Sequence, residues 1–177
     1  MKLIQTLLAI GLAAGSLFAA DYAFTPTRGK VAFSVNHRLL GVVDGRFDKF
    51  EGTIRIEASS VKALNGAIET ASINTDNVKR DEHLRNDDFF DEPNFPKITF
   101  ASKSASGSTI TGDLTIRGIT KPVTLTIKRD LESGRTADIY TLSAQIKRSD
   151  FKIGDTITTN AQIGDDVVIK LTIRPAI

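Results

Sequence analysis

One stretch of the chain, residues 112–127, constrains the fold more than any other. Leu114 and Ile116 alternate with polar residues up to Gly118, and the alternation resumes at Val123. An apolar residue at every second position turns one face of a β-strand toward a core, and a glycine between two such runs marks a turn. We therefore predict an antiparallel β-hairpin with one buried face.

The same period of two recurs along the chain after residue 30. One long alternating run, 42–57, changes phase near Asp48 and Lys49, which predicts a bulge or a strong bend. Strands at short, even spacing with polar turns are typical of a sandwich or an up-and-down barrel, and hairpin connections favour the barrel. We predict an all-β fold of eight antiparallel strands, which are the two strands of the hairpin from about 109 and the runs at about 30–38, 42–57, 62–75, 97–103, 138–148 and 166–174.

A single segment, residues 77–95, lacks this period. Asn77 is suited to cap a helix, and the charged residues that follow include no glycine or proline. Pro93 and Pro96 prevent a helix from continuing further. We predict a short helical insertion between the third and fourth strands.

The first twenty residues are expected to form a secretory signal peptide rather than part of the fold. A positive residue is followed by an apolar run, and small residues precede the first acid, Asp21. The run is short for a membrane span, which needs about 20 apolar residues, so no integral membrane segment is expected. An uncleaved anchor is the alternative. The predicted organisation is a signal peptide at 1–20, cleaved after Ala19 or Ala20, and one domain at 21–177.

Charge and composition argue against several function classes. The formal net charge is +2 with acids and bases well mixed, so no nucleic-acid partner is expected. The chain has no cysteine, which excludes thiol catalysis and cysteine-ligated metals. It also has no nucleophile, phosphate-binding or dinucleotide motif. We expect a protein that is not an enzyme and needs no cofactor.

The densest polar cluster, residues 80–92, permits two interpretations. His83 and Asp87 have the i, i+4 spacing of a helical metal site, which His37 from the first strand could complete. The alternative is a solvated helix with local ion pairs. Two histidines in the whole chain are few for a metal site, so no bound metal is expected.

Two further features concern the interior of the predicted barrel. His37 shares the apolar face of its strand with Phe33 and Val35, and is either a core histidine bonded to a buried partner or a polar group that orients a ligand. Phe89 and Phe90 are adjacent and must point in different directions. We expect one of them to close the end of the barrel, as a lid or as core, and the other to pack outside.

Seven blocks of the chain follow a characteristic order and spacing, namely 33–37, 42–47, 72–77, 80–91, 95–100, 112–123 and 148–154. Together they resemble the YceI-like family, although Lys152 stands where the last block is expected to have glycine. The resemblance covers essentially all of the chain after residue 20. It implies a lipocalin-like antiparallel barrel with one or two short helices, exported to the periplasm, that binds a long polyisoprenoid or fatty-acid-type chain in its lumen, often as a homodimer.

The leading hypothesis is therefore an eight-stranded lipocalin-like barrel that acts as a periplasmic carrier for a long-chain isoprenoid or fatty-acid-type lipid. Arg80 and His83 are further candidates to meet the polar end of such a ligand. The residues expected to bind the ligand are Phe33, Val35, His37, Phe47, Phe50, Leu84, Phe89, Phe90, Phe100, Leu114, Leu142 and Ile169.

Three alternatives remain at the level of sequence. A barrel of about eight strands can be packed solid, which would make the protein an interaction module without a ligand. A metal-dependent enzyme that acts on lipids would use the charged helix. An outer-membrane barrel would need an outward apolar face with aromatic girdles, which two tyrosines and no tryptophan fit badly.

Overall fold

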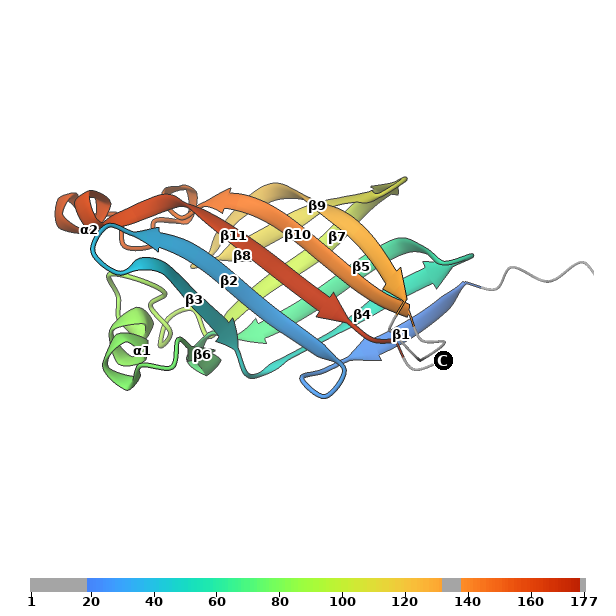
Figure 1. Cartoon of the computed structure of the whole chain (residues 1–177), viewed down its shortest axis with the longest axis horizontal. Helices are drawn as coiled ribbons and strands as arrows, with labels where there is room; N and C mark the ends of the chain where they lie inside the picture. The colour runs from blue at the N-terminus through green and yellow to red at the C-terminus, as the bar shows by residue number, and fades with distance from the viewer. Residues whose placement is uncertain (1–18, 132–137, 176–177) are drawn as a thin grey trace, which may run out of the picture.

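The computed structural model describes residues 19–131 and 138–175. These residues form one antiparallel sheet of eleven strands, in the order β1-β4-β5-β7-β8-β9-β10-β11-β2-β3-β6. The sheet curls strongly into a half-barrel, and two short helices lie at one end of it (Figure 1). The all-β, lipocalin-like fold class predicted from the alternation is thus confirmed.

The strands are β1 (Ala20–Phe24), β2 (Gly29–His37), β3 (Gly41–Phe47), β4 (Phe50–Glu57), β5 (Ser60–Glu69), β6 (Ile73–Asn74), β7 (Lys97–Ser106), β8 (Thr109–Ile116), β9 (Ile119–Leu131), β10 (Asp138–Lys147) and β11 (Ile163–Ile173). The helices are α1 (Val78–Arg85) and α2 (Ile157–Gln162), and two 3₁₀ turns are η1 (Thr70–Ser72) and η2 (Ser149–Phe151).

The predicted number of eight strands is wrong, for three physical reasons. The long run 42–57 is two strands, because β3 pairs with β2 whereas β4 pairs with β1 and β5. The predicted third strand ends at Glu69, and its last residues form η1 and the short β6. Finally, β1 begins at Ala20, the last residue of the predicted signal peptide; the rest of that peptide, apart from Ala19, lies outside the described residues.

The phase change at Asp48 and Lys49 marks a bend where the chain passes from one edge of the sheet to the other. β3 lies near one edge of the sheet and β4 near the other, so this two-residue connection joins the two edges covalently. The Asp48 amide donates to the Ser72 carbonyl at 3.0 Å, and the Glu69 amide donates to the Lys49 carbonyl at 3.0 Å. The sheet is therefore closed at this corner by the chain itself rather than by a continuous ring of strand pairs.

The hairpin predicted at 112–127 is present as β8 and β9. Ile116 pairs with Ile119, and the two residues between them, Arg117 and Gly118, have φ values of 50° and 70°. Positive φ at both positions is typical of the tight turns that match the twist of a hairpin. The Arg117 guanidinium donates to the carbonyls of Asp87, at 2.8 Å, and Lys152. This turn is thereby tied to two loops at the helical end of the sheet.

The helical insertion is also as predicted, and a second helical segment, which the family resemblance allows but the periodicity did not locate, follows β10. The Asn77 side chain accepts a hydrogen bond from the Arg80 amide at 3.1 Å and caps α1. The additional segment consists of η2 and α2, where the Thr156 hydroxyl caps α2 by accepting from the Thr159 amide at 3.2 Å. Six residues without an amphipathic pattern give too weak a periodic signal for prediction.

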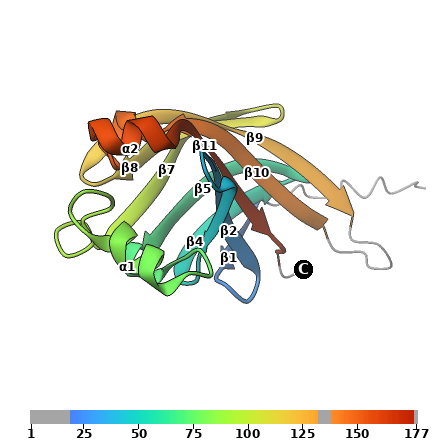
Figure 2. The same cartoon turned by 60° about the vertical axis from the view of Figure 1, so that its left-hand side comes forward.

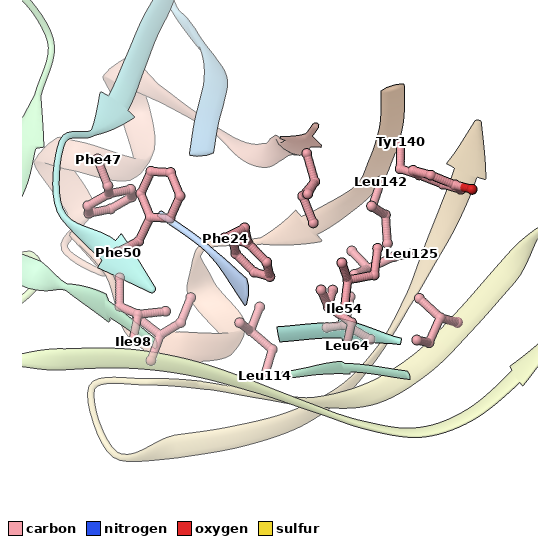
Figure 3. Close-up of a cluster of buried hydrophobic side chains, with 14 of the residues drawn as sticks. Phe24, Phe47, Phe50, Ile54, Leu64, Ile98, Leu114, Leu125, Tyr140 and Leu142 are labelled. Carbon is pink, nitrogen blue, oxygen red and sulfur yellow. The ribbon is translucent and has the colours of Figure 1, made fainter. Parts of the chain in front are cut away.

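The inward side chains of the curled sheet pack against one another in a continuous hydrophobic core. Figure 3 shows Leu125 and Leu142 close to Ile54 and Leu64, which come from strands far apart in the chain. At the end away from the helices the core is solid, and we call it the packed end; its residues are Ile54, Val61, Ile110, Tyr140 and Ile173, all of which are buried. Toward the helices the interior opens into a cavity.

Candidate functional site

An apolar cavity of about 230 Å³ lies inside the curl of the sheet and reaches its helical end. One wall comes from inward side chains of β2, β3 and β11, and the opposite wall from β5, β7 and β8. Residues of α1, of the loop after it and of the loop after β10 border the cavity. Figure 2 shows α1 and α2 at the same end of the sheet. The lining is almost wholly apolar.

Aromatic rings form a continuous part of the wall. The centroids of Phe33 and Phe47 are 5.8 Å apart, and Phe90 meets Phe47 edge-on at 6.1 Å. Phe33 and Phe90 remain only half-buried although both face inward. Large apolar side chains of this kind are normally buried when they face a filled core. Their residual exposure shows that the core is not filled at this point.

A glycine on the neighbouring strand lets Phe33 lie flat against the wall. Gly45 is the pairing partner of Phe33, and a Cβ built on Gly45 would lie 2.1 Å from Cζ of the Phe33 ring. The ring thus occupies the place of the missing side chain. Any larger residue at 45 would displace the ring, and the cavity beside it would change shape.

One polar group at the border of the cavity has hydrogen-bonding capacity to spare. The Arg80 guanidinium donates from Nε to the Thr75 hydroxyl at 2.7 Å and from Nη2 to the Thr75 carbonyl at 2.8 Å. The buried Asp81 carboxylate accepts from the amide and hydroxyl of Thr75, at 2.8 and 2.6 Å. Nη1 of Arg80 has no hydrogen bond to any residue within 19–131 and 138–175. Arg80 is therefore oriented by Thr75 and borders the cavity, with its Nη1 unused among these residues.

A second guanidinium, that of Arg148, is buried and saturated. It donates to the carbonyls of Gly164, Ile153, Gly154 and Ile163 and to the side chain of Asn160, at distances between 2.6 and 3.1 Å. All five guanidinium hydrogens of an arginine are used in such an arrangement. Arg148 thus fixes the loop after β10 and the start of β11 in place, and its positive charge lies close to the cavity without a free donor.

The two histidines have separate roles. His37 borders the cavity, and its Nδ1 accepts from the amides of Leu39 and Leu40 at 3.2 and 3.3 Å. His83 contacts Asp88 at 2.8 Å through Nε2 and is not among the residues that border the cavity. Within the described ranges, no group of three histidine, cysteine, aspartate or glutamate side chains is placed to hold a metal ion.

All twelve residues predicted to bind a ligand border the cavity. Their role in binding stays a prediction, because the geometry places them at a cavity and does not show an occupant. The expectation that one of Phe89 and Phe90 packs outside the barrel is wrong. Both face the cavity, because the chain turns sharply after α1: the Phe90 amide donates to the Leu84 carbonyl at 3.0 Å.

Sequence reasoning missed several residues of the site. Val167 and Leu171 alternate with outward residues on β11 in phase with Ile169, so the period of two could have identified them. Arg148 and Ile153 carry no such signal. They reach the cavity only because the loop after β10 folds back over its end.

The fold and the cavity together define a class of protein, the curled antiparallel barrels with an apolar interior site. Residues 22–174 match the family described as the YceI-like domain. The chain therefore belongs to this family. No helix in the part of the chain that the structure describes is long and apolar enough to cross a bilayer.

Individual relatives agree with this assignment. Protein YceI of Escherichia coli O17:K52:H18 is 35% identical over 161 residues, which cover 84% of each chain. Among solved structures, BcnA of Burkholderia cenocepacia has a TM-score of 0.75 at 23% identity, covering 85% of this chain and 98% of that one. A polyisoprenoid binding domain from Saccharophagus degradans has a TM-score of 0.64 at 16% identity, covering 90% and 100%. These two structures share the fold.

Proposed function

We propose that the protein is a periplasmic carrier that holds a long apolar chain, of polyisoprenoid or fatty-acid type, in the cavity. The observation that carries the proposal is an apolar cavity of about 230 Å³ bordered by inward side chains that stay half-buried. This volume lies just below the roughly 300–1,000 Å³ of typical ligand pockets. Each methylene that leaves water contributes about 0.8 kcal/mol, so affinity should rise with the length of chain that the cavity encloses.

Two further lines support the proposal. The first is the leader-like segment at 1–20, which is the reason to place the carrier in the periplasm. The second is that the polyisoprenoid binding domain from Saccharophagus degradans has the same fold. The homodimer implied by the family resemblance is likewise part of the proposal.

Arg80 is the group best suited to meet the polar end of the ligand. Arg148 has no free donor and His37 accepts from two backbone amides, whereas Nη1 of Arg80 is unused among the residues that the structure describes. A ligand with a hydroxyl, carboxylate or phosphate head would place that head beside α1, and its apolar chain would extend toward Phe50. An Arg80→Met variant should retain binding of a headless hydrocarbon probe and bind the matching fatty acid more weakly.

The test of the proposal is native mass spectrometry of protein exported to a periplasm and purified without detergent, followed by organic extraction. We expect an excess mass that extracts as one lipid class. Ile169→Trp should abolish it, because Ile169 points into the cavity. Val168→Trp is the matched control, since Val168 directly precedes Ile169 on β11 and is exposed on the outer face. A bare polypeptide mass with no uptake of isoprenoid or fatty-acid probes would refute the carrier.

A further inference from the structure

Exposed aliphatic side chains gather at the helical end of the half-barrel, on two segments. The turn between β2 and β3 carries Leu39 and Leu40, exposed by 80% and 61%, and β3 continues with Val42 at 61%. Ile157 in the first turn of α2 is 91% exposed. We call these four residues the apolar rim.

The two segments of the apolar rim lie side by side. The Arg38 amide donates to the Gln162 carbonyl at 2.7 Å and so joins the turn after β2 to the last residue of α2. In Figure 1 this turn lies next to α2, and α1, which carries the exposed Val78, lies at the same end. The rim is therefore one surface rather than scattered side chains.

The rim is also continuous with the cavity. His37 and Ile163 are pairing partners at the ends of β2 and β11, and both border the cavity. Leu39 and Leu40 follow His37 directly, and their amides donate to its Nδ1. A wall residue of the cavity thus holds the shape of the exposed turn.

The form of the rim indicates what covers it. A stable protein–protein interface takes roughly 20–30 residues from each partner, whereas the rim offers four exposed aliphatic side chains on two neighbouring segments. A few projecting apolar side chains are sufficient to enter the boundary between headgroups and acyl chains, where the surroundings need no complementary shape. The apolar character of the rim favours penetration over attraction by charge.

We propose that the apolar rim inserts into the surface of a phospholipid bilayer and presents the end of the cavity to it. This inference rests on the proposed carrier function, because a ligand that is insoluble in water must leave and enter a bilayer without crossing the solvent. Insertion of the rim would bring His37, Ile163 and α1 next to the headgroups. A polar head of the ligand at Arg80 would then lie on the bilayer side.

The test is co-sedimentation of the full exported chain with phosphatidylcholine vesicles. We expect Leu39→Ser/Leu40→Ser to lower the partition coefficient by roughly 100-fold, since the burial of each leucine corresponds to about a factor of ten or more. Ile157→Ser, on the other segment, should lower it by a smaller factor. Binding should be the same at low and high salt, because screening acts on charges and not on apolar burial.

Leu131→Ser is the matched control. Leu131 is 69% exposed, and it ends β9 at the other end of the sheet from the Arg117 turn. Its replacement should leave vesicle binding unchanged. Equal loss in the control and in the rim variants would overturn the proposal, as would an unaltered chain that stays in the supernatant.

Two outcomes separate this proposal from the carrier function. A chain that carries an extractable lipid but does not sediment with vesicles refutes insertion and leaves the carrier intact. A chain that sediments through the rim but never contains lipid supports insertion and refutes the carrier. If gel filtration shows a dimer that Leu39→Ser/Leu40→Ser converts to a monomer, the rim binds a second copy instead and the proposal is wrong.

Discussion

The packed end and the cavity end of the half-barrel follow the same alternation of residues but differ in how closely their inward side chains pack. At the packed end Ile54 and Ile110 are completely buried. At the cavity end Phe33, Val35 and Ile169 point inward with the same regularity and stay half-buried. The period of two fixes which face of a strand turns inward, whereas the curvature of the sheet and the loops across its end decide whether that face meets a partner.

The largest effect is expected at the loop that closes the cavity end. Arg148→Met should lower the free energy of unfolding by about 4 kcal/mol, because it leaves several buried carbonyl groups without donors. Urea unfolding followed by circular dichroism measures the change. Arg148→Lys keeps the positive charge but has fewer hydrogen-bond donors in another geometry, so it should recover only part of the lost free energy of unfolding. A loss below about 1 kcal/mol in the methionine variant would show that water replaces the guanidinium.

The next prediction contrasts the two ends directly. Ile54→Ala at the packed end should cost about 3 kcal/mol, because it leaves a cavity in a filled core. Ile169→Ala should cost about 1 kcal/mol or less, because that side chain already borders an open space. The same unfolding experiment on protein freed of lipid gives both values. If the two variants lost the same free energy of unfolding, the side chains at the two ends would be equally well packed and the comparison would be wrong.

Gly45→Ala tests whether a glycine keeps the cavity open. Its Cβ would collide with Phe33 and push that ring toward the lumen, so we expect a loss of roughly tenfold in affinity for a long-chain probe. Titration with a fluorescent fatty acid provides the measurement. The double variant Gly45→Ala/Phe33→Leu removes part of the ring and should recover affinity. Unchanged binding in the single variant would place the ligand elsewhere.

A smaller gain in stability is expected at Lys152, in the loop after β10. Its φ of 54° and ψ of 33° lie in the left-handed region, which glycine adopts without steric cost. This is the position at which the family resemblance leads one to expect glycine. Lys152→Gly should raise the free energy of unfolding by about 0.5–1 kcal/mol. Thermal unfolding of the unaltered chain and of Lys152→Gly measures the difference in stability. A destabilised glycine variant would show that the lysine side chain has a stabilising contact.

The smallest effect concerns acid stability at Asp165 on β11, which accepts hydrogen bonds from Ser149 in the same loop. Burial acts to raise the pKa of Asp165, but hydrogen bonds from the amide and hydroxyl of Ser149 and the charges of Lys147 and Arg148 outweigh it, so the pKa lies below its ordinary 3.8. A lowered pKa stabilises the fold above about pH 3.8, and this contribution is lost as the pH falls through the folded-state value. The stability of Asp165→Asn should therefore approach that of the unaltered chain below this pH. A constant difference down to acid pH would contradict the assignment.

The sequence by itself determined the fold class, the hairpin at β8 and β9, the helical insertion after Asn77 and the inward face of strands such as β2, β10 and β11. These features depend on neighbours along the chain, since a period of two and a capping side chain act locally. For the same reason the predicted residues on the strands face one interior, whereas Leu84, Phe89 and Phe90 reach it through α1 and the turn that follows it. The strand count failed at Asp48 and Lys49, because the phase change there indicates a bend but does not show that the two halves of the run pair with different strands.

Only the tertiary structure decided that this interior is hollow at one end and solid at the other. Whether Ile54 or Ile169 is fully buried depends on what lies across the curl from it, and that residue is remote in sequence. The cage of carbonyls around Arg148 and the contact of Phe33 with Gly45 likewise arise from the close approach of separate segments. Alternation specifies direction, whereas a cavity is a property of the distances between walls, and those distances exist only in the folded chain.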